Sequence, residues 1–236
     1  MMINNRLMAV ANYINHNKLA DIGSDHAYLP IYALQQGMIE GAVAGEVVIG
    51  PFNAAKENVR KYDLQDKIDV RLGNGLEVIE KGEVDCITIC GMGGPLISEI
   101  LDNGKDKLSD YPTLILQSNI HTEAVRRKLL ELGYKIKDEV IMKERKHVYE
   151  IIVAERNVDN TTYTDTELKF GPVLMQQKDE IFKEKWMREF HHLNTVYDAI
   201  KSDERHAYKA SQLSSDIDRL KEVLNIEHTR IITDYS

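Results

Sequence analysis

The first two thirds of the chain alternate short apolar runs rich in β-branched residues with longer segments of helical pattern. This order is typical of an α/β fold, in which a largely parallel sheet carries helices on both faces. The last two apolar runs are joined only by a charged turn, which predicts a closing pair of strands. Helices are expected within 27–37, 51–64 and 123–134, and seven strands within 18–23, 41–48, 67–79, 84–94, 113–119, 135–144 and 147–155.

The texture changes after Arg156, where a polar, turn-rich segment precedes a region that is helical in pattern. Two narrow apolar seams recur there at spacings of three and four residues. They predict two helices, split near Ser202, that form an antiparallel hairpin and either pack as a coiled coil or dock on a partner. We expect a domain of residues 1–160 and a coiled-coil domain of residues 161–236. The seams consist of Leu193, Tyr197 and Ile200, and of Leu213, Ile217, Leu220 and Leu224.

The 236 residues are 43% hydrophobic and 29% charged, an ordinary composition for a globular chain with a core. No apolar run is long enough for a membrane helix, and the N-terminus lacks the pattern of a signal peptide. We therefore expect no membrane partner and a cytoplasmic location. Cys86 and Cys90 fall on one face of an expected strand, and no Cys or His cluster completes a ligand set, so we expect neither a disulfide nor a metal site.

The stretch ADIGSDHAYLP, residues 20–30, has the position of a nucleotide-binding loop after a first strand but lacks the usual glycine fingerprint. Asp25 in this loop would repel a pyrophosphate. S-adenosylmethionine carries a sulfonium, an ammonium and a carboxylate but no phosphate, so it tolerates an acidic loop. Glu46 ends the second expected strand, about 20 residues further on, where an acid that binds the ribose is expected. The loop thus favours a methyl donor over a dinucleotide.

Two further glycine-rich loops follow the third and fourth expected strands, GNGL at 73–76 and CGMGG at 90–94. Ligands of open parallel sheets bind beyond the carboxyl ends of the strands, so these loops converge on one crevice. A tight turn without any ligand is the alternative interpretation of Gly91, Gly93 and Gly94.

The formal net charge of −8 argues mildly against a nucleic-acid partner. Residues 125–147 depart from this average, because eight of them are basic and four are acidic. The segment is either a solvated helix face and hairpin or an edge that follows phosphates.

Several motifs together resemble one family, the bacterial tRNA (adenine-N1)-methyltransferases of the TrmK type. The resemblance rests on LADIGSDHAYLP at 19–30, AGEVVIGPF at 44–52, CGMGG at 90–94 and LQSN at 116–119, and it extends over the whole chain. It implies a Class I, Rossmann-like methyltransferase domain with a C-terminal coiled-coil hairpin. It also implies methyl transfer from S-adenosylmethionine to N1 of the adenine at position 22 of tRNA. One departure is Asn74, where an Asp is expected in the loop after the third strand; the side-chain carbonyl of Asn can still accept from the adenine amino group.

The resemblance also assigns expected roles to residues. Glu46 would hold the ribose, Val47 would pack on the adenine, and Asn74 with Gly75 would face the adenine edge. His26 and Tyr28 either contact the donor or simply pack at a helix start. The residues expected around the methionine part of the donor are Asp21, Gly23, Ser24 and Asp25, and those expected to line the passage to the target base are Gly91, Met92 and Gly93. The RNA-binding candidates are Arg126, Arg127, Lys128, Arg145 and Lys146.

The expected chemistry needs no base to create the nucleophile, because N1 of neutral adenine already carries a lone pair. Alignment and desolvation should dominate. No single catalytic residue is identified; the candidates for stabilising the cationic product are Asp21, Asp25, Gln117 and Asn119. A small-molecule methyltransferase and a non-catalytic donor-binding module remain alternatives. The sequence does not fix the oligomeric state, although a monomer is favoured.

Overall fold

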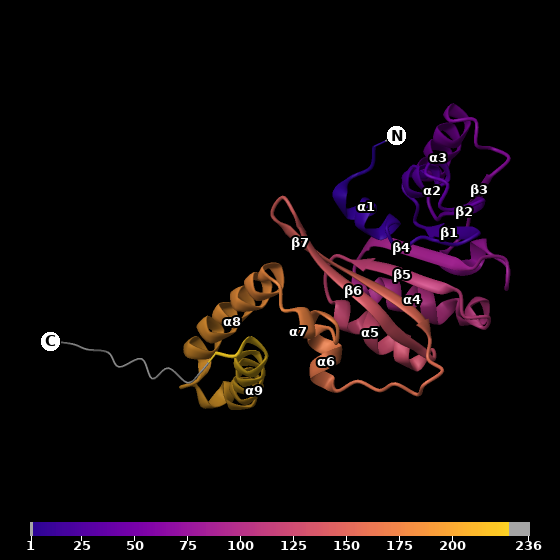
Figure 1. Ribbon diagram of the computed structural model, residues 1–236. Coiled ribbons are helices and arrows are strands. Elements are labelled where there is room, and N and C mark those ends of the chain that lie inside the picture. The colour runs from indigo at the N-terminus through magenta and orange to yellow at the C-terminus, as the bar shows by residue number, and fades with distance from the viewer. Residues whose placement is uncertain (1, 227–236) are drawn as a thin grey trace. The chain divides into compact units, whose positions relative to one another are not determined.

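A seven-stranded sheet dominates the computed structural model, which describes residues 2–226 (Figure 1). The strand order is β3-β2-β1-β4-β5-β7-β6, with β1 to β5 parallel and β7 antiparallel to both of its neighbours. All seven strands expected from the sequence are therefore confirmed, including the closing antiparallel pair. They span β1 Lys18–Ile22, β2 Gly41–Glu46, β3 Ile68–Leu72, β4 Cys86–Met92, β5 Thr113–Ser118, β6 Tyr134–Glu144 and β7 His147–Arg156.

Helices cover both faces of the sheet, and each face has its own apolar core. On one face, Leu19 and Ile115 pack with helices α1 (Asn5–Ala11), α2 (Tyr28–Gln35) and α3 (Ile49–Lys61). On the other face, Ala20 and Leu116 pack with α4 (Gly94–Asn103), α5 (Thr122–Glu131) and the short 3-10 helices η1 (Gly75–Val78) and η2 (Lys105–Leu108). Neighbouring residues of one strand thus serve opposite cores, as the pleat requires. This alternation explains why the central strands read as continuous apolar runs.

Two helices of this region were not expected from the sequence. α4 begins inside the glycine-rich loop, with Pro95 in its first turn, and its apolar face is buried through Ile97 and Leu101. Its pattern was hidden because the glycines before it indicated only a turn. α1 is a seven-residue helix with Asn4 as its N-cap, where the Asn4 side chain accepts a hydrogen bond from the Leu7 amide at 2.8 Å. A helix this short carries little periodic signal of its own.

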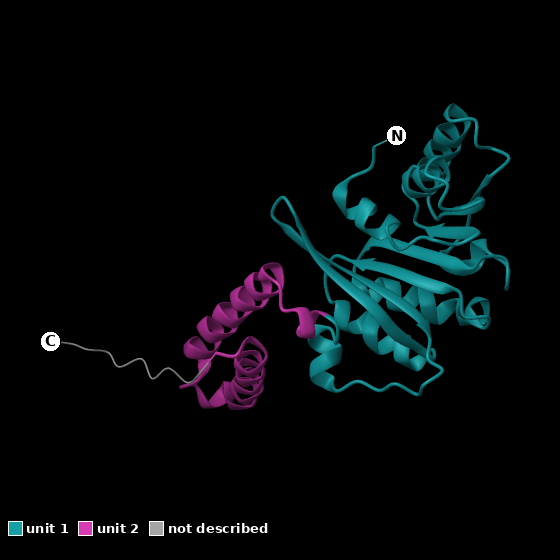
Figure 2. Cartoon of the chain, viewed as in Figure 1, with its two compact units in different colours: residues 1–173 teal, residues 174–236 magenta. Residues whose placement is uncertain are grey.

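The described chain divides into two compact units, residues 1–173 and 174–236 (Figure 2). The division lies after Val173 rather than near residue 160, because helix α6 (Asp165–Phe170) is held on the sheet domain. The buried guanidinium of Arg126 donates to the carbonyls of Leu168 and Lys169, each at 3.2 Å. The Glu139 carboxylate accepts from the Val173 amide at 2.9 Å.

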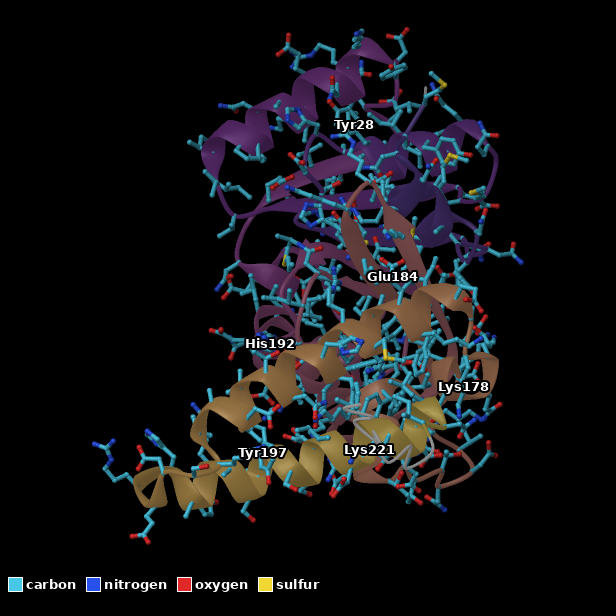
Figure 3. The ribbon with its side chains drawn as sticks, turned by 90° about the vertical axis from the view of Figure 1, so that its left-hand side faces the viewer. Tyr28, Lys178, Glu184, His192, Tyr197 and Lys221 are labelled. Carbon is cyan, nitrogen blue, oxygen red and sulfur yellow. The ribbon has the colours of Figure 1, made fainter. Side chains whose placement is uncertain are left out.

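The second unit is the helical hairpin expected from the sequence. Helix α7 (Leu174–Gln177) precedes the long helices α8 (Glu180–Ile200) and α9 (Ala207–Leu224), which are joined through the short η3 (Glu204–His206). Figure 3 labels His192 and Tyr197 along α8 and Lys221 on α9. The most buried residues of the pair are Phe182, Trp186, Ala210, Ile217, Leu220 and Val223.

Candidate functional site

The loop after β1 adopts an unusual backbone conformation. Gly23 has φ +68°, and Asp25, His26 and Ala27 follow with φ of 43°, 67° and 57°. Three successive non-glycine residues in the left-handed region are costly, at about 1–2 kcal/mol each. Such a run persists only where the surrounding structure enforces it. Here the Gly23 and Ser24 amides donate to the Gly45 carbonyl at 2.9 and 3.2 Å, which ties the loop to the end of β2.

Asp21 is buried at the end of β1, and its side chain is hydrogen-bonded to this loop. One carboxylate oxygen accepts from the Ser24 hydroxyl and the other from the Thr88 hydroxyl on β4, both at 2.6 Å. Burial raises the pKa of Asp21, and the two hydroxyl donors oppose that shift. Asp21 therefore holds Ser24 and β4 together. Thr88 is a partner that the sequence offered no signal for, since it is one apolar-flanked residue within a buried strand.

Glu46 lies at the end of β2 and is almost fully buried. Its Oε1 accepts from the Asp25 amide at 2.5 Å, so the strained loop is fastened by the same side chain that is predicted to bind the ribose. Burial raises the pKa of Glu46, the Asp25 amide opposes this shift, and the carboxylates of Asp21 and Asp25 add to it. The Asp25 side chain itself is 80% exposed and lies 3.5 Å from His26 Nε2. Three acidic side chains, those of Asp21, Asp25 and Glu46, thus lie close together at the loop after β1.

An exposed apolar stretch follows Glu46 directly. Val47, Val48 and Ile49 are 63%, 55% and 58% exposed, although large apolar side chains normally seek cover. Nearby in the fold, a cavity of about 140 Å³ is lined by Asn74 and Gly75 and by residues of α4. The apolar surface and the cavity flank the carboxyl ends of β2 and β3, where the sequence predicts the adenine.

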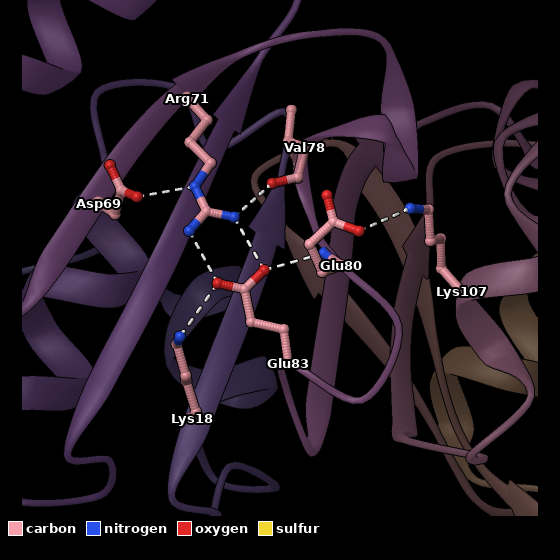
Figure 4. A network of polar contacts seen from close by, with 7 residues as sticks. All are labelled: Lys18, Asp69, Arg71, Val78, Glu80, Glu83 and Lys107. Atoms are coloured by element: carbon pink, nitrogen blue, oxygen red, sulfur yellow. Dashed lines mark hydrogen bonds and ion pairs between the residues drawn. The ribbon is translucent and has the colours of Figure 1, made fainter.

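An ionic network connects Arg71 and Val78, the residues on either side of the Asn74–Gly75 loop, with Glu83 (Figure 4). Arg71 of β3 donates to both oxygens of Glu83, at 2.8 and 2.7 Å, and to the Val78 carbonyl at 2.8 Å. Lys18 of β1 adds a contact to Glu83 at 3.1 Å. The Arg71 hydrogen bonds lower the pKa of Glu83 to about 2. The network therefore ties β1, β3 and the segment after η1 into one support.

Hydrogen bonds connect the loop after β4 to the loop after β5. Gly91, with φ +77°, donates its amide to Gln117 Oε1 at 2.8 Å, and Asn119 Nδ2 donates to the Gly91 carbonyl at 2.9 Å. The Asn119 amide donates to the Met92 carbonyl, also at 2.9 Å. Arg6 of α1 donates to the same Gln117 oxygen. The structure thus brings together Gly91, Met92, Gln117 and Asn119, as the sequence predicted, and adds Arg6, which lies far away in the chain.

His26 and Tyr28 lie at the start of α2, and their rings stack with centroids 5.2 Å apart. Both side chains are partly exposed, and Tyr28 is labelled in Figure 3. Their mutual stacking accounts for their placement without a ligand, so a role in donor binding stays a prediction.

These residues fit the methyl donor better than a phosphate-bearing cofactor. The buried carboxyl group of Glu46 can accept from ribose hydroxyls, and the acidic groups of Asp21, Asp25 and Glu46 favour a ligand that carries sulfonium and ammonium charges. The same carboxylates would oppose a pyrophosphate. Among the residues that the structure describes, no group of three or more His, Cys, Asp or Glu side chains could hold a metal ion.

The predicted RNA-binding residues fall into three different environments. Arg126 is 0% exposed and pairs with Glu139 and Glu150 at 2.6 Å each, so the prediction that it binds RNA is wrong. A helical position next to two other basic residues suggested an exposed face, but Arg126 occupies the buried stripe of α5. Arg127 is partly exposed and pairs with Glu123 and Asp165.

The remaining three candidates differ in how open they are to solvent. Lys128 pairs with Asp102 and Glu131. Arg145 and Lys146 form the exposed two-residue turn between β6 and β7. The β5–β7 register ends at Ser118 opposite Glu150, so this hairpin tip extends beyond the carboxyl end of β5 (Figure 1). It therefore stands at the same edge of the sheet as the donor loops.

The strand order, the acid that ends β2 and the converging loops define a Class I methyltransferase. Within this class, the chain belongs to the tRNA (adenine(22)-N(1))-methyltransferase family, TrmK, whose model matches residues 19–222. In the part of the chain that the structure covers, no helix is long and apolar enough to cross a membrane.

Individual relatives agree with this membership over nearly the whole chain. The tRNA (adenine(22)-N(1))-methyltransferase of Bacillus subtilis is 44% identical, with 95% of this chain and 98% of that protein covered. The crystal structure of the B. subtilis M1A22 tRNA methyltransferase TrmK matches with a TM-score of 0.89 at 43% identity, covering 94% of this chain and 99% of that one. Streptococcus pneumoniae Sp1610 in complex with S-adenosyl-L-methionine matches with a TM-score of 0.86 at 39% identity, covering 94% and 100%.

Proposed function

We propose that this protein transfers a methyl group from S-adenosylmethionine to N1 of the adenine at position 22 of tRNA. One observation carries the proposal: three features meet at the carboxyl ends of the parallel strands of a Class I sheet. They are the Glu46 carboxylate, the Asn74–Gly75 loop, and the hydrogen-bonded loops of Gly91 and Asn119. Family membership over residues 19–222 supports the acceptor, and the relative that was solved with S-adenosyl-L-methionine supports the donor.

On the donor side, each predicted residue has a distinct task. Glu46 accepts from the ribose hydroxyls, Val47 covers one face of the adenine, and Asn74 with Gly75 meets the adenine edge. Asp21 keeps Ser24 in place, and the exposed Asp25 carboxylate offers an acceptor for the ammonium group. When bound, the donor supplies an electrophilic methyl carbon whose bond to sulfur breaks as the bond to N1 forms.

On the acceptor side, the protein has to align the base and exclude water. The adenine N1 lone pair attacks directly, so no side chain needs to take a proton first. The methylated base carries a positive charge, and we assign its stabilisation to the Gly91 carbonyl and to Asn119 Oδ1. The Watson–Crick edge must be free for this reaction, so the target nucleotide is either unpaired or drawn out of its stack before transfer.

We assign contact with tRNA to the turn between β6 and β7 and to the second unit. Arg145 and Lys146 are exposed at the edge where the donor loops lie, which suits them to contact phosphates near the target. Arg127 and Lys128 already pair with carboxylates, so we give them a smaller role. The monomeric state, the cytoplasmic location and the contribution of the hairpin helices stay predictions.

A direct test incubates the protein with radiolabelled S-adenosylmethionine and bulk tRNA that lacks modifications, and then identifies the labelled nucleoside. Label in 1-methyladenosine supports the proposal. Donor binding in calorimetry without transfer to tRNA would favour a small-molecule methyltransferase, and absence of donor binding would contradict the assignment altogether.

A further inference from the structure

Arg6 connects the N-terminal helix α1 to the acceptor side of the site. Its Nη1 donates to Gln117 Oε1, the atom that also accepts from the Gly91 amide at 2.8 Å. The Gln117 side chain is completely buried, and both hydrogen bonds to its oxygen are partly buried. Gly91 has φ +77°, a conformation that favours glycine, and a Cβ there would lie in van der Waals contact with Arg6 Nη1 at 3.4 Å.

These contacts fix the orientation of two amide side chains in series. Arg6 can only donate, and the Gly91 amide can only donate, so both require the oxygen of Gln117 on their side. Gln117 Nε2 then faces Asn119 Oδ1, to which it donates at 3.1 Å. Asn119 Nδ2 is left to donate to the Gly91 carbonyl. The chain of hydrogen bonds therefore runs in one direction, from Arg6 to the exposed end of β5.

Arg6 is itself held by the β6–β7 hairpin. Its guanidinium carbon lies 5.5 Å from the centre of the Tyr149 ring on β7, which is a cation–π contact. The preceding residue of the same helix strengthens this attachment, because the Asn5 amide donates to Glu144 Oε1 at 3.1 Å. Three elements, α1, β5 and β7, thus determine where the guanidinium lies.

We propose that Arg6 is a positioning residue for methyl transfer, which acts through Gln117 to hold Asn119 and the Gly91 turn against the acceptor base. The inference rests on the proposed function. Direct contact of the guanidinium with the reacting base would be unfavourable, because methylation at N1 places a positive charge on that base. Arg6 therefore acts indirectly, by holding the side-chain amides of Gln117 and Asn119 in place. Loss of alignment alone can lower a reaction rate about a hundredfold.

The test compares Arg6→Met and Arg6→Lys with the unaltered protein at saturating tRNA and donor. We expect Arg6→Met to lower kcat by about ten- to a hundredfold while the dissociation constants of donor and tRNA change little. Arg6→Lys keeps a donor for Gln117 and should lose less. Arg60→Met is the matched control, because it removes one exposed positive charge from the last turn of α3, at the opposite edge of the sheet.

Two further measurements separate positioning from a general structural effect. Free guanidinium, well below the concentration that unfolds the protein, should partly restore kcat of Arg6→Ala, whereas potassium chloride at equal ionic strength should not. In the ligand-free protein, the NMR signals of the Gly91 amide and of the Gln117 side-chain amide should shift in Arg6→Met and stay in place in Arg60→Met.

Different failures point to different errors. Unchanged kcat in Arg6→Met, with an active unaltered protein, would overturn this inference alone. A loss of tRNA affinity at constant kcat would also overturn it and would make Arg6 a phosphate contact. An unaltered protein that does not methylate tRNA would overturn the proposed function and this role with it.

Discussion

The buried carboxyl group of Glu46 is expected to lower the stability of the folded protein and to bind the ribose of the donor. Its pKa in the folded chain is raised by burial, so between its unfolded and folded pKa values the unfolded chain binds fewer protons than the folded one. Stability therefore falls as the pH rises through this window, and above the window the ionised carboxylate lowers the free energy of unfolding. The same negative charge is what the donor ribose is expected to use.

Glu46→Gln should consequently trade function for stability. The Gln oxygen can still accept from the Asp25 amide, so we expect an equal or higher Tm at pH 7, whereas donor affinity should fall about tenfold or more, equal to about 1.4 kcal/mol. Calorimetric titration and thermal unfolding measure both. Glu57→Gln, an exposed site on α3, is the control. Unaltered donor affinity in Glu46→Gln would remove Glu46 from the donor site.

The sequence predicted the strands and the loops that follow them, but it did not predict which side chains contact one another. The expected place of Asp21 beside the donor stays a prediction; in the structure both of its oxygens accept from hydroxyl groups, of Ser24 and of Thr88. Arg126 reads as part of a basic surface and is instead buried with two carboxylates. Arg6 carries no sequence signal, because its role depends on a contact with Gln117 that only the folded sheet creates. Sequence patterns predict which face of a helix or strand is buried and where the element ends. Contacts between residues distant in sequence can be found only once the fold is known.

The Arg71–Glu83 network makes the support of the Asn74 loop sensitive to acid. The pKa of Glu83 is lowered to about 2 in the folded chain, so its stabilisation is fully present above the unfolded value of 4.5. It is lost as the pH falls from there toward 2.

Glu83→Gln tests this support. We expect it to lower the free energy of unfolding at pH 7 by about 1 kcal/mol and to leave a smaller difference from the unaltered protein at pH 3. Urea unfolding at both pH values measures this. Glu80→Gln, in the same loop but with a largely exposed side chain, should change little. A loss for Glu83→Gln that is as large at pH 3 as at pH 7 would contradict the ionic explanation.

The turn between β6 and β7 is the element best suited to contact tRNA phosphates. Replacing Arg145 and Lys146 with Ala should weaken tRNA binding and reduce the slope of log affinity against log salt concentration by about 2. Donor affinity should not change. Replacing Arg127 and Lys128 instead should have the smaller effect, because both already pair with carboxylates. If the salt dependence of tRNA affinity has the same slope in the Arg145/Lys146 double variant as in the unaltered protein, the RNA contact lies elsewhere.

The two compact units predict where the chain can be cut. A fragment of residues 1–173 keeps the acceptors of Arg126 at Leu168 and Lys169 and should fold and bind the donor. It should methylate tRNA about a hundredfold less well, equal to about 2.8 kcal/mol, if the helical hairpin holds the substrate.

A fragment of residues 1–164 is the matched comparison. It leaves the buried Arg126 without those carbonyl partners and should lose about 3 kcal/mol or more of stability. Circular dichroism, donor titration and tRNA kinetics on both fragments measure these expectations. Full tRNA activity in fragment 1–173 would mean that the hairpin serves another purpose, and equal stability of the two fragments would contradict the anchoring role of Arg126.

The most direct measurement uses three versions of one tRNA substrate that differ only at position 22. With adenosine there, the unaltered protein and labelled donor should produce 1-methyladenosine at that position. With guanosine, or with 1-deazaadenosine, in which carbon replaces N1, transfer should be absent while tRNA binding persists. Transfer of label to either altered tRNA, or label at any other position of the adenosine form, would contradict methylation of N1 at adenine 22.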